Sequence, residues 1–182
     1  MSDRSFDDPE LEQRRLAALR QIRQFGDPAL RSPAAPISTF DPALREEAER
    51  MVGIMIDARG VGLAAPQLGS LRRLIVARPG EDEAAVALAN PVVAWSSEEE
   101  EVGVEGCLSL GEITVDVPRA SAVRIEALSV EGDDIEIEAE GFAARVLLHE
   151  IDHLNGVLIL DRVDAEQRRA ALRELRAGSA VA

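Results

Sequence analysis

His149-Glu150-Ile151-Asp152-His153 contains both histidines of the chain, four residues apart, with a glutamate next to the first. Positions i and i+4 of a helix lie on one face, so the two imidazoles would project side by side. This arrangement is typical of a metal site in which the glutamate acts as general base. The five residues therefore predict a central helix that carries a metal centre.

The helix around this motif is expected to run from about Gly141 to Gly156. Its inward stripe would consist of residues spaced by 4, 3 and 4, namely Phe142, Val146, His149 and His153. Two buried imidazoles without partners would be costly polar groups. Burial on this face therefore favours a bound metal over two histidines without a ligand.

Two further segments carry candidate residues. The only cysteine, Cys107, follows an extended segment, and its thiolate can complete a three-ligand site with one position open for water. By itself, a single buried cysteine is more often a small hydrophobic residue. In residues 60–67 the glycines allow close backbone approach, and Gln67 offers an amide to a developing oxyanion. The alternative for that loop is a helix C-cap and a turn.

The composition limits the class of protein. The 182 residues are 46% hydrophobic, and the net charge of −14 argues against nucleic acid or an anionic membrane as the main partner. A single cysteine excludes an intrachain disulfide framework, and no apolar run approaches the ~18 residues of a membrane span. No signal peptide is visible in residues 1–10, so a cytoplasmic protein is expected.

Cap signals organise the first third of the chain. Residues 1–9 are expected to be a disordered lead-in, and residues 10–182 a single domain. Asp8-Pro9 predicts the start of a helix that stops at Gly26, and Asp41-Pro42 predicts a second helix that ends near Ala58. The apolar stripe of that second helix would be Leu44, Ala48, Met51 and Met55.

Strand patterns occupy residues 74–76, 86–95, 123–130 and 135–139. The last two flank the turn at 131–133, which predicts a hairpin. Residues 96–101 are expected to form a solvated turn, 158–160 a short strand and 165–177 a final helix. This order favours an α+β fold, with mainly antiparallel strands around a central helix carrying HExxH, N-terminal helices and a C-terminal helix.

Three motifs together resemble the signature motifs of the peptide deformylases: GVGLAAPQ at 60–67, EGCLS at 105–109 and HEIDHLNG at 149–156. The similarity extends to 25–31, to Asn90-Pro91 and to 117–120, and covers roughly residues 20–165. The resemblance implies one metal held by Cys107, His149 and His153, with water as the fourth ligand. Fe²⁺ would be the metal in the cell, with Zn²⁺ or Ni²⁺ as substitutes.

The resemblance also implies the reaction. Glu150 would be the general acid and base in the removal of the formyl group from an N-formyl-methionyl peptide. The oxyanion would be held by the metal, the Gln67 amide and the backbone N–H of Leu108, while the backbone of Gly62 would bind the formyl amide. The methionine side chain would enter a pocket lined in part by Val61, Phe142 and Val146.

Partners follow from the same resemblance. A monomer is expected, in transient contact with the ribosome through the basic helix at 165–177; an ordinary solvated amphipathic helix is the favoured alternative. Three residues depart from the family pattern and bear on substrate affinity and on the polar surroundings of the metal. Leu148 replaces a common glutamine, Gly111 a common proline, and Thr114 the arginine of some members.

Two other functions are compatible with parts of the sequence. One is a non-catalytic binding protein that keeps the metal for stability, but Glu150 and Gln67 speak against it because a structural zinc site needs neither. The other is a zincin-type endopeptidase, which HExxH allows. A cysteine third ligand from EGCLS does not match that pattern.

Overall fold

The computed structural model describes residues 8–78, 80 and 84–179, and the lead-in expected before the first helix lies mostly outside this part. The α-helices are α1 (Pro9–Leu19), α2 (Pro42–Asp57), α3 (Gly141–Leu154) and α4 (Ala165–Ser179). The strands are β1 (Gly62–Ala64), β2 (Leu74–Ala77), β3 (Val86–Ser96), β4 (Glu100–Gly106), β5 (Thr114–Ala120), β6 (Ala122–Leu128) and β7 (Asp134–Glu140). None of the described helices is long and apolar enough to cross a membrane.

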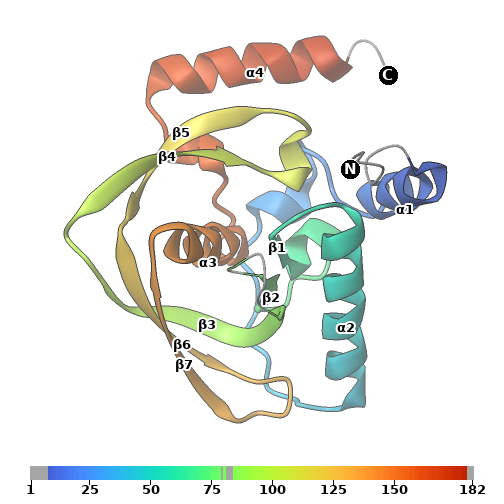
Figure 1. Ribbon diagram of the computed structural model, residues 1–182, viewed down its shortest axis with the longest axis vertical. Helices are drawn as coiled ribbons and strands as arrows, with labels where there is room; N and C mark the ends of the chain where they lie inside the picture. Colours follow the sequence, from blue (N-terminus) through green and yellow to red (C-terminus); the bar gives the residue numbers. More distant parts are fainter. Residues whose placement is uncertain (1–7, 79, 81–83, 180–182) are drawn as a thin grey trace, which may run out of the picture.

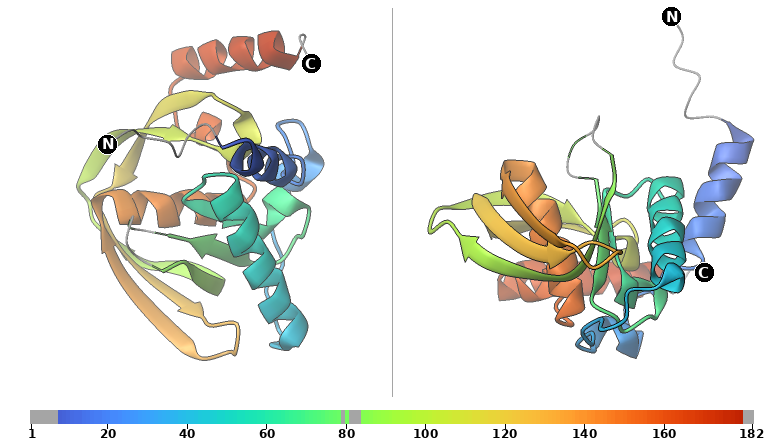
Figure 2. Two further views of the ribbon diagram at one scale, coloured as in Figure 1. Left: turned by 45° about the vertical axis from the view of Figure 1, so that its right-hand side comes forward. Right: turned by 90° about the horizontal axis from the view of Figure 1, so that it is seen from below.

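The strands form two antiparallel sheets. The larger has the order β1-β2-β3-β6-β7, and the smaller consists of β4 and β5 alone. Helix α3 packs against strands of both sheets, and Figure 1 shows it enclosed by them. Helices α1 and α2 lie together at one side of the molecule (Figure 2). The predicted α+β class with mainly antiparallel strands is confirmed.

Helix α3 is largely buried, with eight of its 14 residues shielded from solvent. Leu147, Ile151 and Leu154 pack into a cluster with apolar side chains of the larger sheet, such as Ile75 and Ile125. Full burial of each of these side chains contributes on the order of 1.5–3 kcal/mol to stability. The rigid placement of α3 fixes the two histidines that it carries.

The strong local signals predicted their elements well. Asp41 caps α2 through a hydrogen bond from the Leu44 N–H to its side chain, and the helix ends beside Ala58 as expected. The predicted hairpin is β6 and β7, joined by residues 129–133. Asp8 caps α1, so this helix begins at the predicted Asp8-Pro9 signal.

Four predictions of local structure were wrong. Helix α1 ends at Leu19 rather than Gly26, because the chain turns so that the Arg23 N–H can bond the Gln67 carbonyl. The loop at 60–67 contains the short strand β1. Residues 96–101 are a turn only to 99, since β4 begins at Glu100. Residues 158–160 enter a 3-10 turn, which the Asp161 carboxylate closes by accepting from the Leu158 N–H.

Candidate active site

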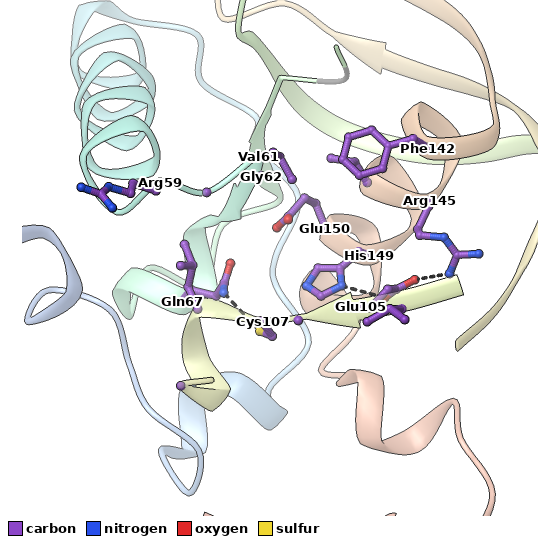
Figure 3. A pocket seen from close by; sticks show the side chains of 16 residues that line it. Arg59, Val61, Gly62, Gln67, Glu105, Cys107, Phe142, Arg145, His149 and Glu150 are labelled. Carbon is purple, nitrogen blue, oxygen red and sulfur yellow. Dashed lines mark hydrogen bonds and ion pairs between the residues drawn. The ribbon is translucent and has the colours of Figure 1, made fainter. Parts of the chain in front are cut away.

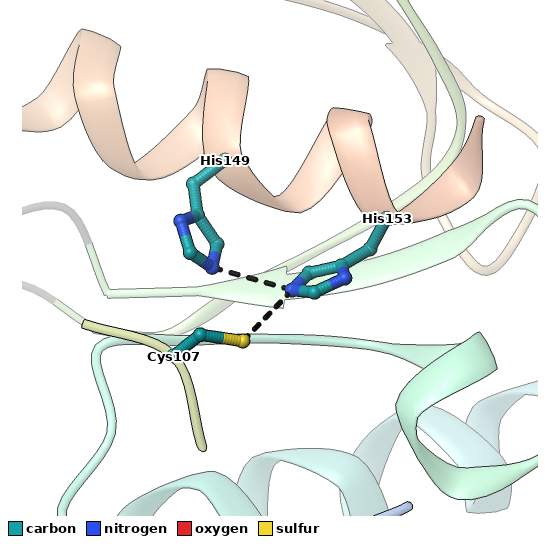
Figure 4. Close-up of side chains that lie close together, drawn as sticks. All are labelled: Cys107, His149 and His153. Carbon is teal, nitrogen blue, oxygen red and sulfur yellow. Dashed lines mark hydrogen bonds between the residues drawn. The ribbon is translucent and has the colours of Figure 1, made fainter. Parts of the chain in front are cut away.

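Three side chains from two elements meet at one point. Helix α3 presents His149 and His153, and Cys107 follows directly after β4 (Figure 4). The two Nε2 atoms lie 3.2 Å apart, and the Cys107 Sγ lies 3.4 Å from His153 Nε2. All three potential ligand atoms lie within 4.8 Å of one another, so sequence-distant residues converge as predicted.

This geometry fits a cation. Two nitrogens, each about 2.1 Å from a tetrahedral ion, would lie about 3.4 Å apart, close to the spacing of the imidazoles. The tautomer of His149 is set by its Nδ1, which lies 2.9 Å from a Glu105 carboxylate oxygen and donates to it. Its Nε2 lone pair therefore points toward His153 and Cys107. A thiolate and two imidazoles suit Zn²⁺ or a late first-row metal such as Fe²⁺.

Glu150 lies beside these ligands with an unsatisfied carboxylate. Its side chain is buried, and the Oε2 atom has no hydrogen-bond partner among the described residues. Burial raises the pKa of this carboxyl to about 7. A carboxyl group that lines a pocket, has a pKa near neutral pH and keeps one oxygen without a partner among the described residues is suited to accept and donate a proton.

Gln67 is held in one orientation by the loop that carries it. Its Oε1 accepts from the Ala64 N–H at 2.9 Å, so the NH₂ group must point the other way, toward the cysteine (Figure 3). This Nε2 donates to Ser109 Oγ at 3.1 Å and lies 3.7 Å from Cys107 Sγ. The site therefore has a preorganised neutral donor next to the predicted metal position.

Glu105 is a buried carboxylate that the sequence analysis did not single out. It makes a bidentate pair with Arg119, at 2.9 and 3.0 Å, and also accepts from Arg145 and His149. Burial alone would raise its pKa, but the hydrogen bonds with Arg119 and His149 lower it to about 2. Glu105 is therefore ionised and fixed, and it orients a predicted metal ligand.

The ion-pair network continues behind the histidines. Arg119 reaches Asp152, the acidic residue inside the HExxH motif, and Asp152 also accepts two hydrogen bonds from Arg162. Burial alone would lower the pKa of Arg119, but the hydrogen bond with Glu105 and the charge of Asp152 raise it. A buried charge is stable only with such partners. Nothing in the local sequence shows that these distant charges meet.

A cavity of about 320 Å³ opens over the site. The predicted residues that line it are Val61, Gly62, Gln67, Cys107, Leu108, Phe142, Val146, His149 and Glu150. His153 lies deeper and is 1% exposed. The predicted inward position of Phe142 was wrong, because this side chain is 58% exposed at the cavity mouth, while Val146 is buried. All ten candidate residues thus lie in or directly behind one pocket.

The three departures from the family pattern have different surroundings. Leu148 packs against the apolar cluster between α3 and the larger sheet. Gly111 lines the cavity with φ +65°, a value that proline cannot adopt and glycine adopts readily. Thr114 is exposed at the start of β5. At Gly111 the edge of the cavity therefore has a backbone conformation that a chain with proline at this position could not adopt.

Comparison with known proteins gives one consistent result. A family model described as polypeptide deformylase matches residues 19–169. A peptide deformylase of Thermotoga neapolitana is 46% identical over 148 residues, which are 81% of this chain and 89% of the relative. The crystal structure of the Thermotoga maritima peptide deformylase has a TM-score of 0.76 at 46% identity, covering 79% of this chain and 96% of that one. The crystal structure of the Thermus thermophilus peptide deformylase gives 0.81 at 43% identity, with 86% and 93% covered.

Proposed function

Because the chain belongs to the peptide deformylase family, we propose specific roles for the residues of its pocket in the reaction of that family. The protein is a metal-dependent hydrolase that removes the N-formyl group from newly synthesised peptides. Its substrates are formyl-methionyl peptides. A non-catalytic binding role is not favoured by these relatives.

We propose that Cys107, His149 and His153 hold the catalytic cation. The observation that supports this proposal is the convergence of their sulfur and two nitrogens within 4.8 Å, next to Glu150, whose Oε2 has no hydrogen-bond partner among the described residues. A divalent cation in that position supplies Lewis acidity, which makes water acidic near neutral pH and polarises the formyl oxygen. The thiolate donor and the reducing compartment implied by a lone cysteine support Fe²⁺, with Zn²⁺ or Ni²⁺ as substitutes.

Glu150 is the proton carrier of this proposal. In its ionised form it takes a proton from the attacking water, and it then delivers that proton to the leaving amine nitrogen. Glu150 lines the pocket, and its buried Oε2 atom has no competing hydrogen-bond partner among the described residues. Burial raises the pKa of Glu150 from 4.5 to about 7 in the metal-free fold, so this carboxyl can both accept and release a proton near neutral pH.

Gln67, Leu108 and Gly62 bind the polar atoms of the formyl amide. The Gln67 Nε2, oriented by Ala64 and Ser109, donates to the oxyanion together with the Leu108 N–H. Gly62 lines the pocket, and its backbone binds the amide of the substrate. The apolar part of the pocket wall, which receives the methionine side chain, is formed by Val61, Phe142 and Val146.

Formate release provides the decisive test. Protein purified anaerobically should release formate from formyl-Met-Ala-Ser, with metal content measured on the same sample. Glu150→Ala should retain the metal and lose turnover, since an acid–base residue contributes about 10²–10⁴-fold. Casein cleavage without formate release would instead indicate an endopeptidase.

The proposal extends to the oligomeric state, the location and the partner of the enzyme. It would work as a monomer in the cytoplasm, with α4 in transient contact with the ribosome. Helix α4 lies at the surface of the molecule (Figure 1) and exposes Arg168, Arg169, Arg173 and Arg176. Its other face packs inward through Ala171 and Leu172. Salt-sensitive co-sedimentation with ribosomes, lost when the four arginines are replaced, would distinguish docking from a merely solvated helix.

A further inference from the structure

Arg145 stands one turn before His149 on α3, and its side chain is only 13% exposed. Its Nη1 donates to Glu105 Oε1 at 2.8 Å and to the Val117 carbonyl at 2.7 Å. Its Nη2 donates to the Glu101 carbonyl at 2.7 Å. One guanidinium therefore joins α3 to both strands of the smaller sheet and to the Glu105 carboxylate, which orients a proposed metal ligand. Figure 3 shows its contact with Glu105.

Gly103 provides the space for this group. A Cβ atom at residue 103 would lie 2.9 Å from the Cζ and Nη2 atoms of Arg145, and the Gly103 carbonyl is a further acceptor at 3.4 Å. Strand β4 has β5 on one side only, so its other edge has no strand partner in the described sheets. The guanidinium thus occupies the position of a missing side chain and holds a strand that borders the pocket.

We propose that Arg145, seated over Gly103, is a positioning residue that sets the place of Glu105, and through it of His149, in the metal site. This inference rests on the metal ligands proposed above. Arg145 lines the pocket, yet its donors face the strands and Glu105 rather than the reacting atoms. Its effect is therefore transmitted through Glu105, which accepts from both Arg145 and the His149 ring.

The chemistry of arginine suits this position. A guanidinium presents several donors in a rigid planar fork, whereas an ammonium is a single point. Lysine at 145 carries all its donors on one nitrogen, so it could not replace both Nη1, which bonds Glu105 and Val117, and Nη2, which bonds the Glu101 carbonyl. Residues that orient a metal-ligating histidine typically affect metal affinity or activity 10–100-fold.

The test uses Arg145→Met, Gly103→Ala and their double variant, with Arg45→Met as the matched control. Arg45 makes an exposed ion pair with Glu131, and neither residue lines the pocket. For each protein, the Zn²⁺ dissociation constant is measured by competition with a chromophoric chelator, and kcat and KM are measured for formyl-Met-Ala-Ser. Circular dichroism checks folding.

Arg145→Met and Gly103→Ala should each raise the Zn²⁺ dissociation constant and lower kcat by about 10-fold or more. The double variant should be no worse than Arg145→Met, because the added methyl group fills the space that the guanidinium left. Arg145→Lys should recover only part of the loss. If Arg145→Met does not fold, the Zn²⁺ dissociation constant and kcat of Gly103→Ala test the proposal, since the added methyl group displaces the Arg145 guanidinium.

Additive losses in the double variant would overturn the proposal, as would unchanged metal affinity in folded Arg145→Met or full recovery with lysine. A purely structural role would lower thermal stability without changing the Zn²⁺ dissociation constant. Failure of the proposed function is distinguishable, because the wild-type protein itself would then release no formate.

Discussion

Gly62 lies so close to Glu150 that a side chain there would overlap the proposed acid–base group. A Cβ atom at this position would lie 2.2 Å from Glu150 Oε1, and Glu150 is too buried to move aside freely. We expect Gly62→Ala to displace the carboxylate and to lower kcat by about 100-fold or more. Formate release and metal content measured together test this, because the three ligands should keep their ion.

Gly53→Ala is the matched control for this substitution. Gly53 lies inside α2, and a Cβ atom there would meet nothing within 4 Å. Alanine in a helix interior should stabilise the protein by about 0.5–1 kcal/mol and leave kcat unchanged. Equal activity of the two alanine variants would contradict the importance of the contact between Gly62 and Glu150.

The raised pKa of Glu150 predicts a pH-dependent penalty in the metal-free protein. Burial shifts this pKa from 4.5 to about 7, so the folded state favours the protonated carboxyl. The unfolded chain releases that proton at lower pH, so this contribution to stability is lost as pH rises from about 4.5 through 7. Glu150→Gln stays neutral throughout.

The free energy of unfolding of metal-free Glu150→Gln, minus that of the wild type, should therefore increase between pH 4.5 and 7 and then level off. Denaturant unfolding at a series of pH values measures this difference, and the variant's own curve serves as the reference for the titrating histidines. A difference that is constant with pH would show that Glu150 titrates normally in the fold.

At the level of elements, Arg119 joins β5 to β4 and to α3 through two buried acids. Its side chain is 5% exposed, and it pairs with Glu105 and Asp152. Arg119→Met would leave both carboxylates short of a partner, which typically costs about 3–5 kcal/mol. Arg14→Met, which removes an exposed pair with Asp57, should cost about 0–1 kcal/mol. Denaturant unfolding of the metal-free variants tests the contrast.

Elements were predictable where the deciding signals are local. Helix α2 carries its own cap at Asp41 and a complete apolar stripe, and the β6–β7 hairpin has a turn beside its strands. Strands β4 and β5 were not predicted as a pair, because the two valines of β4 are exposed, its other residues are acids and glycines, and its register depends on a distant partner. The end of α1 likewise depends on the bond between Arg23 and Gln67, far apart in sequence.

The residues of the site also divide into those that a local motif identifies and those whose partners lie far away in the sequence. Cys107, His149 and His153 stand in recognisable motifs, so their convergence could be expected from the sequence. Arg145 and Arg119 occupy no motif that reveals their partners, because each acts across more than ten residues of chain on another element. A buried charge network is specified by the three-dimensional arrangement of the elements. The roles of such residues can be recognised only once the three-dimensional arrangement of the strands is known.

At the scale of the molecule, the proposed metal site is one of the places where the smaller sheet meets α3. Cys107 follows β4, while both histidines belong to α3. An ion bound only by the folded protein stabilises it by RT ln(1 + [L]/Kd), about 4.1 kcal/mol at 1,000 times Kd. For a chain of this size, each kcal/mol corresponds to roughly 2–4 °C in Tm.

Chelation should therefore lower Tm by roughly 8–16 °C at that saturation. Amide exchange should rise most in β4 and β5, since the five-stranded sheet keeps its pairing and its core against α3 without the ion. Cys107→Ser should start from the lower Tm and respond little to the chelator. Thermal unfolding and hydrogen-exchange mass spectrometry provide the measurements. An equal rise of exchange in both sheets would mean that the ion stabilises the whole domain rather than this junction.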